Sequence, residues 1–307
     1  MLNFIFNTIL NAVFKFFGIL SLPSLHRLGV VLGWLIYWCM PKSSITIKNN
    51  IKTSGLAKGA QQFKQILNAN IGESGKAVFE TIGIWQKKET DILGLVRQVH
   101  GWQTVKDALQ LGKGIIFLTP HLGCFEITSI YYGSKHPITV LYRPPKLQLL
   151  HNFILQGRTR KGVTLAEASA SGVRKLMQAL KRNEAIGILP DQIPAAGEGE
   201  WADFFGKQAY TMTLASKLAE KTGATVIMAF GERLANGTGF DIHITRLESI
   251  ATTTLLNNAI EQQIALNPAQ YLWRYDRYKQ RRHAMEKREA PATTAELKSK
   301  STKNPSE

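Results

Sequence analysis

The first apolar stretch of the chain, residues 2–20, is interrupted by polar residues at every fourth position: Asn3, Asn7, Asn11 and Lys15. This spacing places the polar groups on one narrow stripe of a helix whose other face is Leu, Ile and Phe. The stretch is close to the length of about 20 residues that spans a bilayer, and its stripe also suits a helix lying in the interface. A second apolar run, residues 28–40, follows Pro23 and carries Trp34, Tyr37 and Trp38 as interfacial anchors.

Residues 1–40 are therefore predicted to form a membrane-anchoring helix or hairpin, with a single N-terminal anchor. A cleaved signal peptide is disfavoured, because no Lys or Arg precedes the apolar run and no small-x-small cleavage site follows it. An ordinary core helix is the other alternative. Basic residues flank these segments, and the rest of the chain is basic, so the positive-inside rule places the main domain in the cytoplasm.

Beyond residue 60, short apolar runs bounded by Gly, Pro or charge alternate with helical patterns. This alternation predicts an α/β fold, with a mixed central sheet flanked by helices, over residues 41–283. Residues 284–307 lack aromatic and almost all large aliphatic residues, so they are predicted to be a disordered basic tail. The pattern predicts helices over 61–88, 171–182, 209–222, 252–266 and 268–279, and strands over 114–119, 138–142, 163–167, 185–190, 224–230 and 240–246.

The net charge narrows the classes of partner. Among 307 residues, 38 Lys and Arg face 22 Asp and Glu, a formal net charge of +16. Such a surplus points to an anionic partner: nucleic acid, an acidic membrane surface or an acidic substrate. Only two cysteines are present, which favours a reducing compartment and argues against a zinc cluster. The motifs of serine hydrolases, dinucleotide enzymes, P-loop NTPases and zincins are absent from the sequence.

The chemistry is concentrated in GIIFLTPHLGCFEITSI, residues 114–130, where His121 follows an apolar strand and Glu126 comes five residues later. Within one helix two such residues would face about 140° apart, so they meet only if His121 lies in the loop before the helix. Glu126 is then predicted to orient the imidazole, which removes a proton from a hydroxyl. The alternative is a capping histidine followed by a glutamate that favours the helix dipole.

Further motifs accompany this cluster in order along the chain, and with them the sequence resembles the lipid A biosynthesis late acyltransferases, the lauroyl and myristoyl acyltransferases of bacterial lipopolysaccharide. The resemblance covers nearly the whole chain up to about residue 283. Besides the N-terminal apolar segment, it rests on HLGCFE (121–126), YRPP (142–145), GRTRKG (157–162), LPDQ (189–192), FFGKQA (204–209) and NPAQYLWRYDRYKQR (267–281).

The resemblance implies transfer of a fatty acyl group from acyl carrier protein to a hydroxyacyl chain of a Kdo-bearing lipid A precursor, at the cytoplasmic face of the inner membrane. It implies that His121 is the base and Glu126 its partner. The acceptor hydroxyl attacks the donor thioester directly, so Cys124 need not act and is expected to be a small buried residue. No metal and no cofactor are implied.

Three further residues are predicted to serve the substrate site. Arg143 and Arg158 carry the planar fork that matches phosphate or carboxylate, and Asp191 follows an apolar strand. Each has a structural alternative: a surface residue before a Pro-Pro turn for Arg143, a solvated basic face for Arg158 and a strand-end turn for Asp191.

The expected partners are an acyl carrier protein thioester, an anionic lipid A precursor and membrane lipids. The aromatic and basic segment 271–282 also fits nucleic acid by composition, but the apolar N-terminus favours a lipid surface, so no nucleic-acid partner is predicted. The alternatives are an acyltransferase for another membrane lipid, a glycolipid or ornithine lipid, and a non-catalytic membrane lipid-binding protein.

Overall fold

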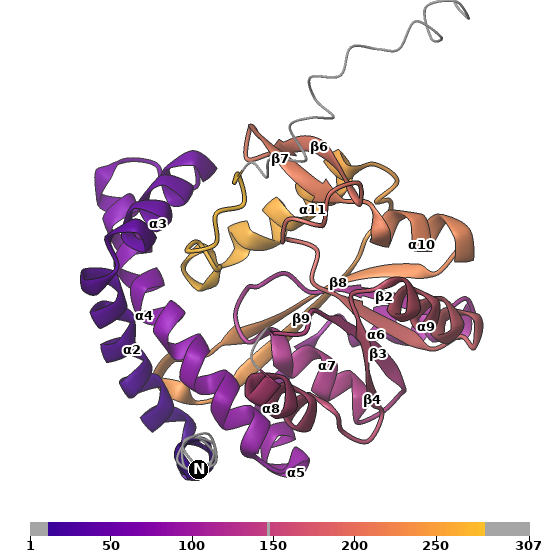
Figure 1. Ribbon diagram of the computed structural model, residues 1–307, viewed down its shortest axis with the longest axis horizontal. Helices are drawn as coiled ribbons and strands as arrows, with labels where there is room; N and C mark the ends of the chain where they lie inside the picture. The colour runs from indigo at the N-terminus through magenta and orange to yellow at the C-terminus, as the bar shows by residue number, and fades with distance from the viewer. Residues whose placement is uncertain (1–11, 146–147, 280–307) are drawn as a thin grey trace, which may run out of the picture.

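The computed structural model describes residues 12–145 and 148–279, and its centre is a mixed seven-stranded sheet (Figure 1). The strand order is β1-β9-β8-β2-β5-β3-β4. β8 and β9 pair antiparallel, whereas the other neighbours in the sheet pair parallel, so the predicted α/β fold with a mixed sheet is confirmed. The strands are β1 Val96–His100, β2 Ile115–Leu118, β3 Ile138–Tyr142, β4 Val163–Glu167, β5 Ala185–Ile188, β8 Thr225–Arg233 and β9 Phe240–Arg246.

Alternating side chains of the central strands build two apolar cores, one on each face of the sheet. Ile115 and Phe117 belong to the core that includes residues of α6 and α7, while Ile116 and Leu118 belong to the core of α9, α10 and α11. This alternation follows from the two-residue period of a strand. The covering helices are α5 Glu89–Leu93, α6 Trp102–Gln110, α7 Phe125–Gly133, α8 Gln148–Arg158, α9 Ala170–Lys181, α10 Leu214–Thr222 and α11 Thr253–Leu266.

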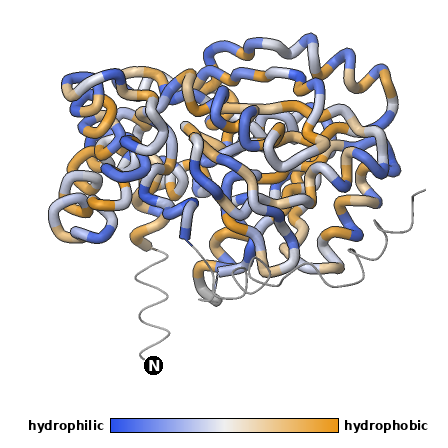
Figure 2. Tube along the Cα trace, turned by 90° about the horizontal axis from the view of Figure 1, so that it is seen from above, coloured by the Kyte–Doolittle hydropathy of each residue, from blue (hydrophilic) through white to orange (hydrophobic). Residues whose placement is uncertain are grey.

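Three N-terminal helices form a separate layer beside the sheet, at the left of Figures 1 and 2: α2 Leu22–Cys39, α3 Pro41–Ser54 and α4 Ala60–Gln86. α2 and α4 touch backbone to backbone. A Cβ on Gly33 would lie 2.0 Å from the Ile71 carbonyl oxygen, and one on Gly75 would lie 1.9 Å from that of Gly29. The Gly29-x-x-x-Gly33 spacing thus removes side chains from one face of α2, where α4 packs.

The α4 helix confirms the helix predicted over 61–88, but its buried face differs from the expected apolar one. Asn70 and Glu80 are fully buried, whereas Val78, predicted on the apolar face, is 37% exposed. The reason is that α4 packs against irregular backbone as well as against side chains, and Asn70 Nδ2 donates to the carbonyls of Ala269 and Tyr271 at 2.8 and 2.7 Å.

Two predicted helices are wrong. The first half of 209–222 is a strand, β7 Lys207–Met212, which forms a two-stranded hairpin with β6 Gly199–Phe204 before α10 begins. In 268–279, only Pro268–Gln270 forms a short 3-10 turn, η2. The remainder follows an irregular path because its backbone binds elsewhere: Asn50 Nδ2 donates to the carbonyls of Trp273 and Tyr275.

No single helix in the described part of the chain has the length and apolarity of a membrane span, although α2 and α3, bent by 102°, satisfy that criterion together. The predicted anchor over 1–40 therefore stays a prediction, and residues 1–11 lie outside the described residues. The predicted tail, 284–307, and the last residues of the predicted domain, 280–283, also lie outside them.

The glycine contact between α2 and α4 predicts a sharp steric effect. Gly33→Ala should lower the free energy of unfolding by about 1–3 kcal/mol, because the new methyl group meets rigid backbone. Gly72→Ala is the control, since its Cβ would lie 3.5 Å from the Val30 side chain, an ordinary van der Waals distance. Denaturant titration measures both variants; equal stability of the two would contradict the close backbone contact.

Candidate active site

His121 lies in the loop that leaves the carboxyl end of β2 and enters α7. The loop turns at Gly123, whose φ of 60° lies in the left-handed region. A Cβ at this glycine would lie 2.0 Å from the Gly231 carbonyl oxygen, so a larger residue cannot take the same path. The Cys124 amide donates to that same carbonyl at 2.7 Å, and the Gly123 amide donates to the Gln270 carbonyl at 3.1 Å.

Asp191 binds the catalytic candidate His121 through both of its carboxylate oxygens. Oδ1 lies 2.8 Å from His121 Nδ1, and Oδ2 accepts the His121 backbone amide at 2.9 Å. The two residues meet because β2 and β5 are parallel neighbours, so their carboxyl ends lie at the same edge of the sheet. Burial by itself would raise the pKa of Asp191, but the charge and hydrogen bonds of His121 hold that pKa below its usual value.

This pairing sets which nitrogen of His121 can act as a base. An ionised carboxylate only accepts hydrogen bonds, so Nδ1 carries the proton and Nε2 is the unprotonated nitrogen. The Gln192 side-chain amide nitrogen lies 3.3 Å from that Nε2 and donates to it. The imidazole side chain is 14% exposed, so a substrate can reach it. The arrangement is that of a general base oriented by a carboxylate.

Glu126 does not orient His121, and this prediction was wrong. The Glu126 carboxylate instead accepts Arg158 Nε at 2.9 and 3.1 Å and also pairs with Arg158 Nη2. Glu126 lies in the first turn of α7. Phe125 precedes it in the chain, and the Phe125 ring lies 5.1 Å from the His121 imidazole. A catalytic role of Glu126 stays a prediction, with Arg158 rather than His121 as its partner.

The three residues predicted to bind substrate lie in three different settings. Asp191 is only 2% exposed and bound to His121, and its predicted contact with substrate stays a prediction. Arg158 is engaged by Glu126 and lies over the rings of Trp85 and Phe125, at 5.4 and 6.0 Å. Arg143 is exposed just after β3, outside the hydrogen-bond network of His121. Substrate binding by Arg143 and Arg158 stays a prediction.

A hollow, named here the sheet hollow, lies beside Glu126 and Arg158. Its floor comes from strands β2 to β5 and its wall from α7, and most of its lining is apolar, including Phe117, Ile130, Ile138, Val140, Leu165 and Gly187. Phe125 lines this hollow and also the neighbouring one that contains His121. An apolar hollow next to a positioned base suits a substrate with a hydrocarbon chain.

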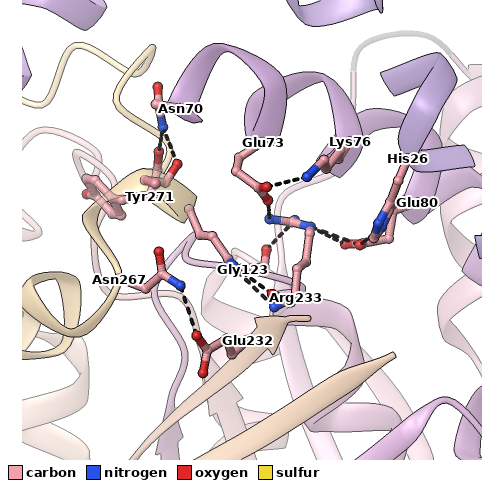
Figure 3. Close-up of polar contacts among 12 residues, drawn as sticks. His26, Asn70, Glu73, Lys76, Glu80, Gly123, Glu232, Arg233, Asn267 and Tyr271 are labelled. Atoms are coloured by element: carbon pink, nitrogen blue, oxygen red, sulfur yellow. Dashed lines mark hydrogen bonds and ion pairs between the residues drawn. The ribbon is translucent and has the colours of Figure 1, made fainter. Parts of the chain in front are cut away.

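A buried arginine that the sequence analysis missed holds the loop of His121 in place (Figure 3). Arg233 Nη2 donates to the Gly123 carbonyl at 2.6 Å, and its Nε donates to both oxygens of Glu80 on α4. Glu80 also accepts His26 Nε2 at 2.9 Å. Although burial opposes ionisation, Arg233 and His26 hold the pKa of Glu80 below its usual value. The only signal in the sequence is a charged residue at the end of an apolar strand.

Neither a reactive cysteine nor a metal-binding group of side chains is found among the described residues of the site. The Cys124 thiol is 2% exposed, and burial raises its pKa well above the usual value, which disfavours the nucleophilic thiolate. Within the described ranges, no group of three or more His, Cys, Asp and Glu side chains is arranged to hold a metal ion.

Comparison with known proteins gives a consistent family. The sequence model of the bacterial lipid A biosynthesis acyltransferases matches residues 2–280. The chain is 23% identical to the lipid A biosynthesis lauroyltransferase of Escherichia coli K12 over 270 residues, which cover 85% of this chain and 87% of the relative. It is 24% identical, with the same coverage, to the palmitoleoyltransferase of that strain. It is also 25% identical to a phosphatidylinositol mannoside acyltransferase of Mycobacterium tuberculosis H37Rv, over 58% of each chain.

The Glu126–Arg158 pair predicts a large effect on stability. Arg158→Ala should lower the free energy of unfolding by about 3–5 kcal/mol, because it leaves the buried Glu126 carboxylate without its cation. The double variant Glu126→Gln/Arg158→Ala is the matched control, in which a neutral amide removes the unpaired charge. Urea denaturation at neutral pH should show the double variant to be the more stable; the reverse order would contradict the pairing.

Proposed function

Because the chain belongs to the bacterial lipid A biosynthesis acyltransferase family, it is an enzyme of acyl transfer in lipid A biosynthesis, and we propose its donor, acceptor and mechanism. The donor is an acyl carrier protein thioester, and the acceptor is a hydroxyl on a hydroxyacyl chain of a Kdo-bearing lipid A precursor. The observation that carries the proposal is His121, oriented by Asp191 at 2.8 Å beside the apolar sheet hollow.

The proposed reaction is one direct transfer. His121 Nε2 takes the proton of the acceptor hydroxyl as its oxygen attacks the thioester carbonyl carbon, so a C–O bond forms and the carbonyl oxygen takes the negative charge. The carbonyl reforms, the C–S bond breaks, and the departing thiolate takes the proton from the imidazolium. Asp191 stabilises the imidazolium in the interval, because it is ionised and bound to Nδ1. The products are an ester and a free carrier thiol.

The sheet hollow is the proposed place of the donor acyl chain. Its apolar lining would replace water around the hydrocarbon, and each buried methylene stabilises binding by about 0.8 kcal/mol. Glu126 and Arg158 line the same hollow as a neutralised pair, so neither presents an unpaired charge to the chain. The length of the preferred acyl chain then depends on how far the side chains between the strands and α7 allow the chain to enter the hollow.

The charge and the N-terminal apolar segment support the proposed partners and location. A formal charge of +16 complements both an acidic carrier protein and an anionic lipid. Residues 1–40 would hold the enzyme at the cytoplasmic face of the inner membrane, where the precursor resides. Arg143, exposed beside the site at the end of β3, is a candidate contact for an acidic group of either substrate.

A second acceptor deserves testing because one relative acts on a different lipid. The Mycobacterium tuberculosis relative bears the name of a phosphatidylinositol mannoside acyltransferase, and its match spans 58% of this chain. The same His121 and Asp191 chemistry would acylate a hydroxyl of a glycolipid. The acceptor that is acylated faster by purified protein decides between the two.

The direct test is acyl transfer in detergent with purified protein, acyl carrier protein thioesters of several lengths and the Kdo-bearing precursor. Mass spectrometry should find one added acyl group. His121→Ala should lower kcat by about 10²–10⁴-fold, the usual contribution of a general base. His136→Ala, on a loop away from the network, is the control. Transfer that persists at the wild-type rate in His121→Ala would contradict the proposed mechanism.

Asp191→Asn tests the partner of the base separately. An amide can donate to Nδ1 and so favours the tautomer in which Nε2 holds the proton, which should lower kcat by about 10²–10⁴-fold with little change in either KM. Glu126→Gln serves as the comparison, because Glu126 does not contact the imidazole. Steady-state kinetics of the two variants measure this difference. A larger loss of kcat in Glu126→Gln than in Asp191→Asn would show that Glu126 takes the principal catalytic role.

A further inference from the structure

His121 lines a second hollow, on the side of α4, which is separate from the sheet hollow proposed for the donor chain. This loop hollow is lined by His121, Gly123, Phe125, Glu73 and Ser74, among others. It shares only Phe125 with the sheet hollow. A transferase must bring two substrates to one base, and the two hollows meet beside that base.

The loop hollow continues into a third one, between α2, α3 and α4. This helix hollow is lined by Gly33, Ile36, Tyr37, Ser43, Ile47 and Ile71, together with Ser74 and Arg274. Ser74 lines both hollows, so the two lie end to end along α4.

The polar groups that line these two hollows are suited to an anionic, hydroxylated ligand. The Ser43 and Ser74 hydroxyls are buried and make no hydrogen bond to other described groups. Arg274 is half-buried, and no carboxylate pairs with it within residues 12–145 and 148–279. The carboxylate of Glu73, which lines the loop hollow, is already bound by Lys76 at 2.5 Å and Arg233 at 3.4 Å. Its negative charge is therefore neutralised.

The outer rim of the helix hollow is apolar and exposed. α2 and α3 meet at a bend of 102°. Around it Leu35, Trp38, Met40 and Ile45 are 49–67% exposed, while Ile36 and Ile47 of the same helices line the hollow beneath. Figure 1 shows α2 and α3 at the outer edge of the molecule, with α4 between α2 and the sheet. Large exposed apolar side chains grouped at one bend suit the surface of a bilayer.

We propose that the helix hollow and the loop hollow form the acceptor site, which receives an anionic lipid from the bilayer at the α2–α3 bend. Arg274 binds an anionic group of the lipid head, Ser43 and Ser74 bind its polar groups, and an acyl chain bearing the hydroxyl extends along α4 to His121. This inference rests on the proposed function, because it assigns the second substrate of that reaction. The donor chain occupies the sheet hollow, on the other side of Phe125.

Two variants separate the acceptor site from the donor site. Arg274→Gln should raise the acceptor KM by about tenfold, the effect of one charge-assisted hydrogen bond, and leave the KM of the acyl carrier protein thioester unchanged. Ser74→Leu narrows both hollows and should do the same. The control is Arg174→Gln, at an exposed arginine of α9.

Equilibrium binding makes the test independent of catalysis. The Kdo-bearing precursor in detergent micelles should bind the wild type and Arg174→Gln alike, and bind Arg274→Gln about tenfold more weakly. Inorganic phosphate and the deacylated headgroup are separate probes, and both should bind more weakly than the lipid. Thermal unfolding checks that Ser74→Leu is folded; if it is not, Arg274→Gln decides alone.

The outcomes separate this inference from the proposed function. Wild-type transfer with an unchanged acceptor KM in Arg274→Gln overturns the acceptor site but leaves the acyltransferase. Absence of wild-type transfer, with Arg274-dependent binding of the lipid, overturns the proposed reaction but supports the site. Arg274-dependent binding of phosphate alone, with no preference for the lipid, also overturns the site as proposed.

Discussion

The buried guanidinium of Arg233 is the interaction on which the rest of the site depends. It joins Glu80 of α4 to the Gly123 carbonyl of the catalytic loop, and the Gln270 side chain binds the Arg233 backbone on both sides, at 2.9 Å each. Burial opposes its charge, but Glu80 and Glu73 hold the pKa of Arg233 above its usual value. A buried ion pair contributes little net stability, yet its directed hydrogen bonds permit one arrangement of the elements they join.

That arrangement brings three distant parts of the chain around the loop of His121. α4 supplies Glu80 and Asn70, β8 supplies Arg233, and the irregular segment after α11 supplies backbone groups, among them the Leu272 amide that donates to the His121 carbonyl at 3.0 Å. His26 of α2 binds Glu80, so the helix with exposed apolar side chains is linked to the catalytic loop through only two side chains, Glu80 and Arg233.

The site gives each of two buried carboxylates its own partner. Asp191 binds the imidazole, where it selects the tautomer that leaves Nε2 free, and Glu126 binds Arg158, where the pair forms part of the wall of the sheet hollow. Each carboxylate is compensated, so neither adds an unpaired charge to the apolar surroundings. The consequence is a base that can accept a proton next to a hollow that can accept a hydrocarbon chain.

The sequence by itself determined the alternating α/β class, most of the central strands, the position of His121 between a strand and a helix, and the family, because these depend on local periodicity and on ordered motifs. It did not determine the partners. Asp191 lies 70 residues from His121, and the two meet only because β5 is placed beside β2 in the sheet. The segment after α11 has an amphipathic, helix-like sequence, yet it is irregular because Asn50 and Asn70 bind its carbonyls. Strand order and such long-range hydrogen bonds depend on how whole elements pack against one another. Periodicity along the chain does not encode this packing, so these features become visible only in the folded structure.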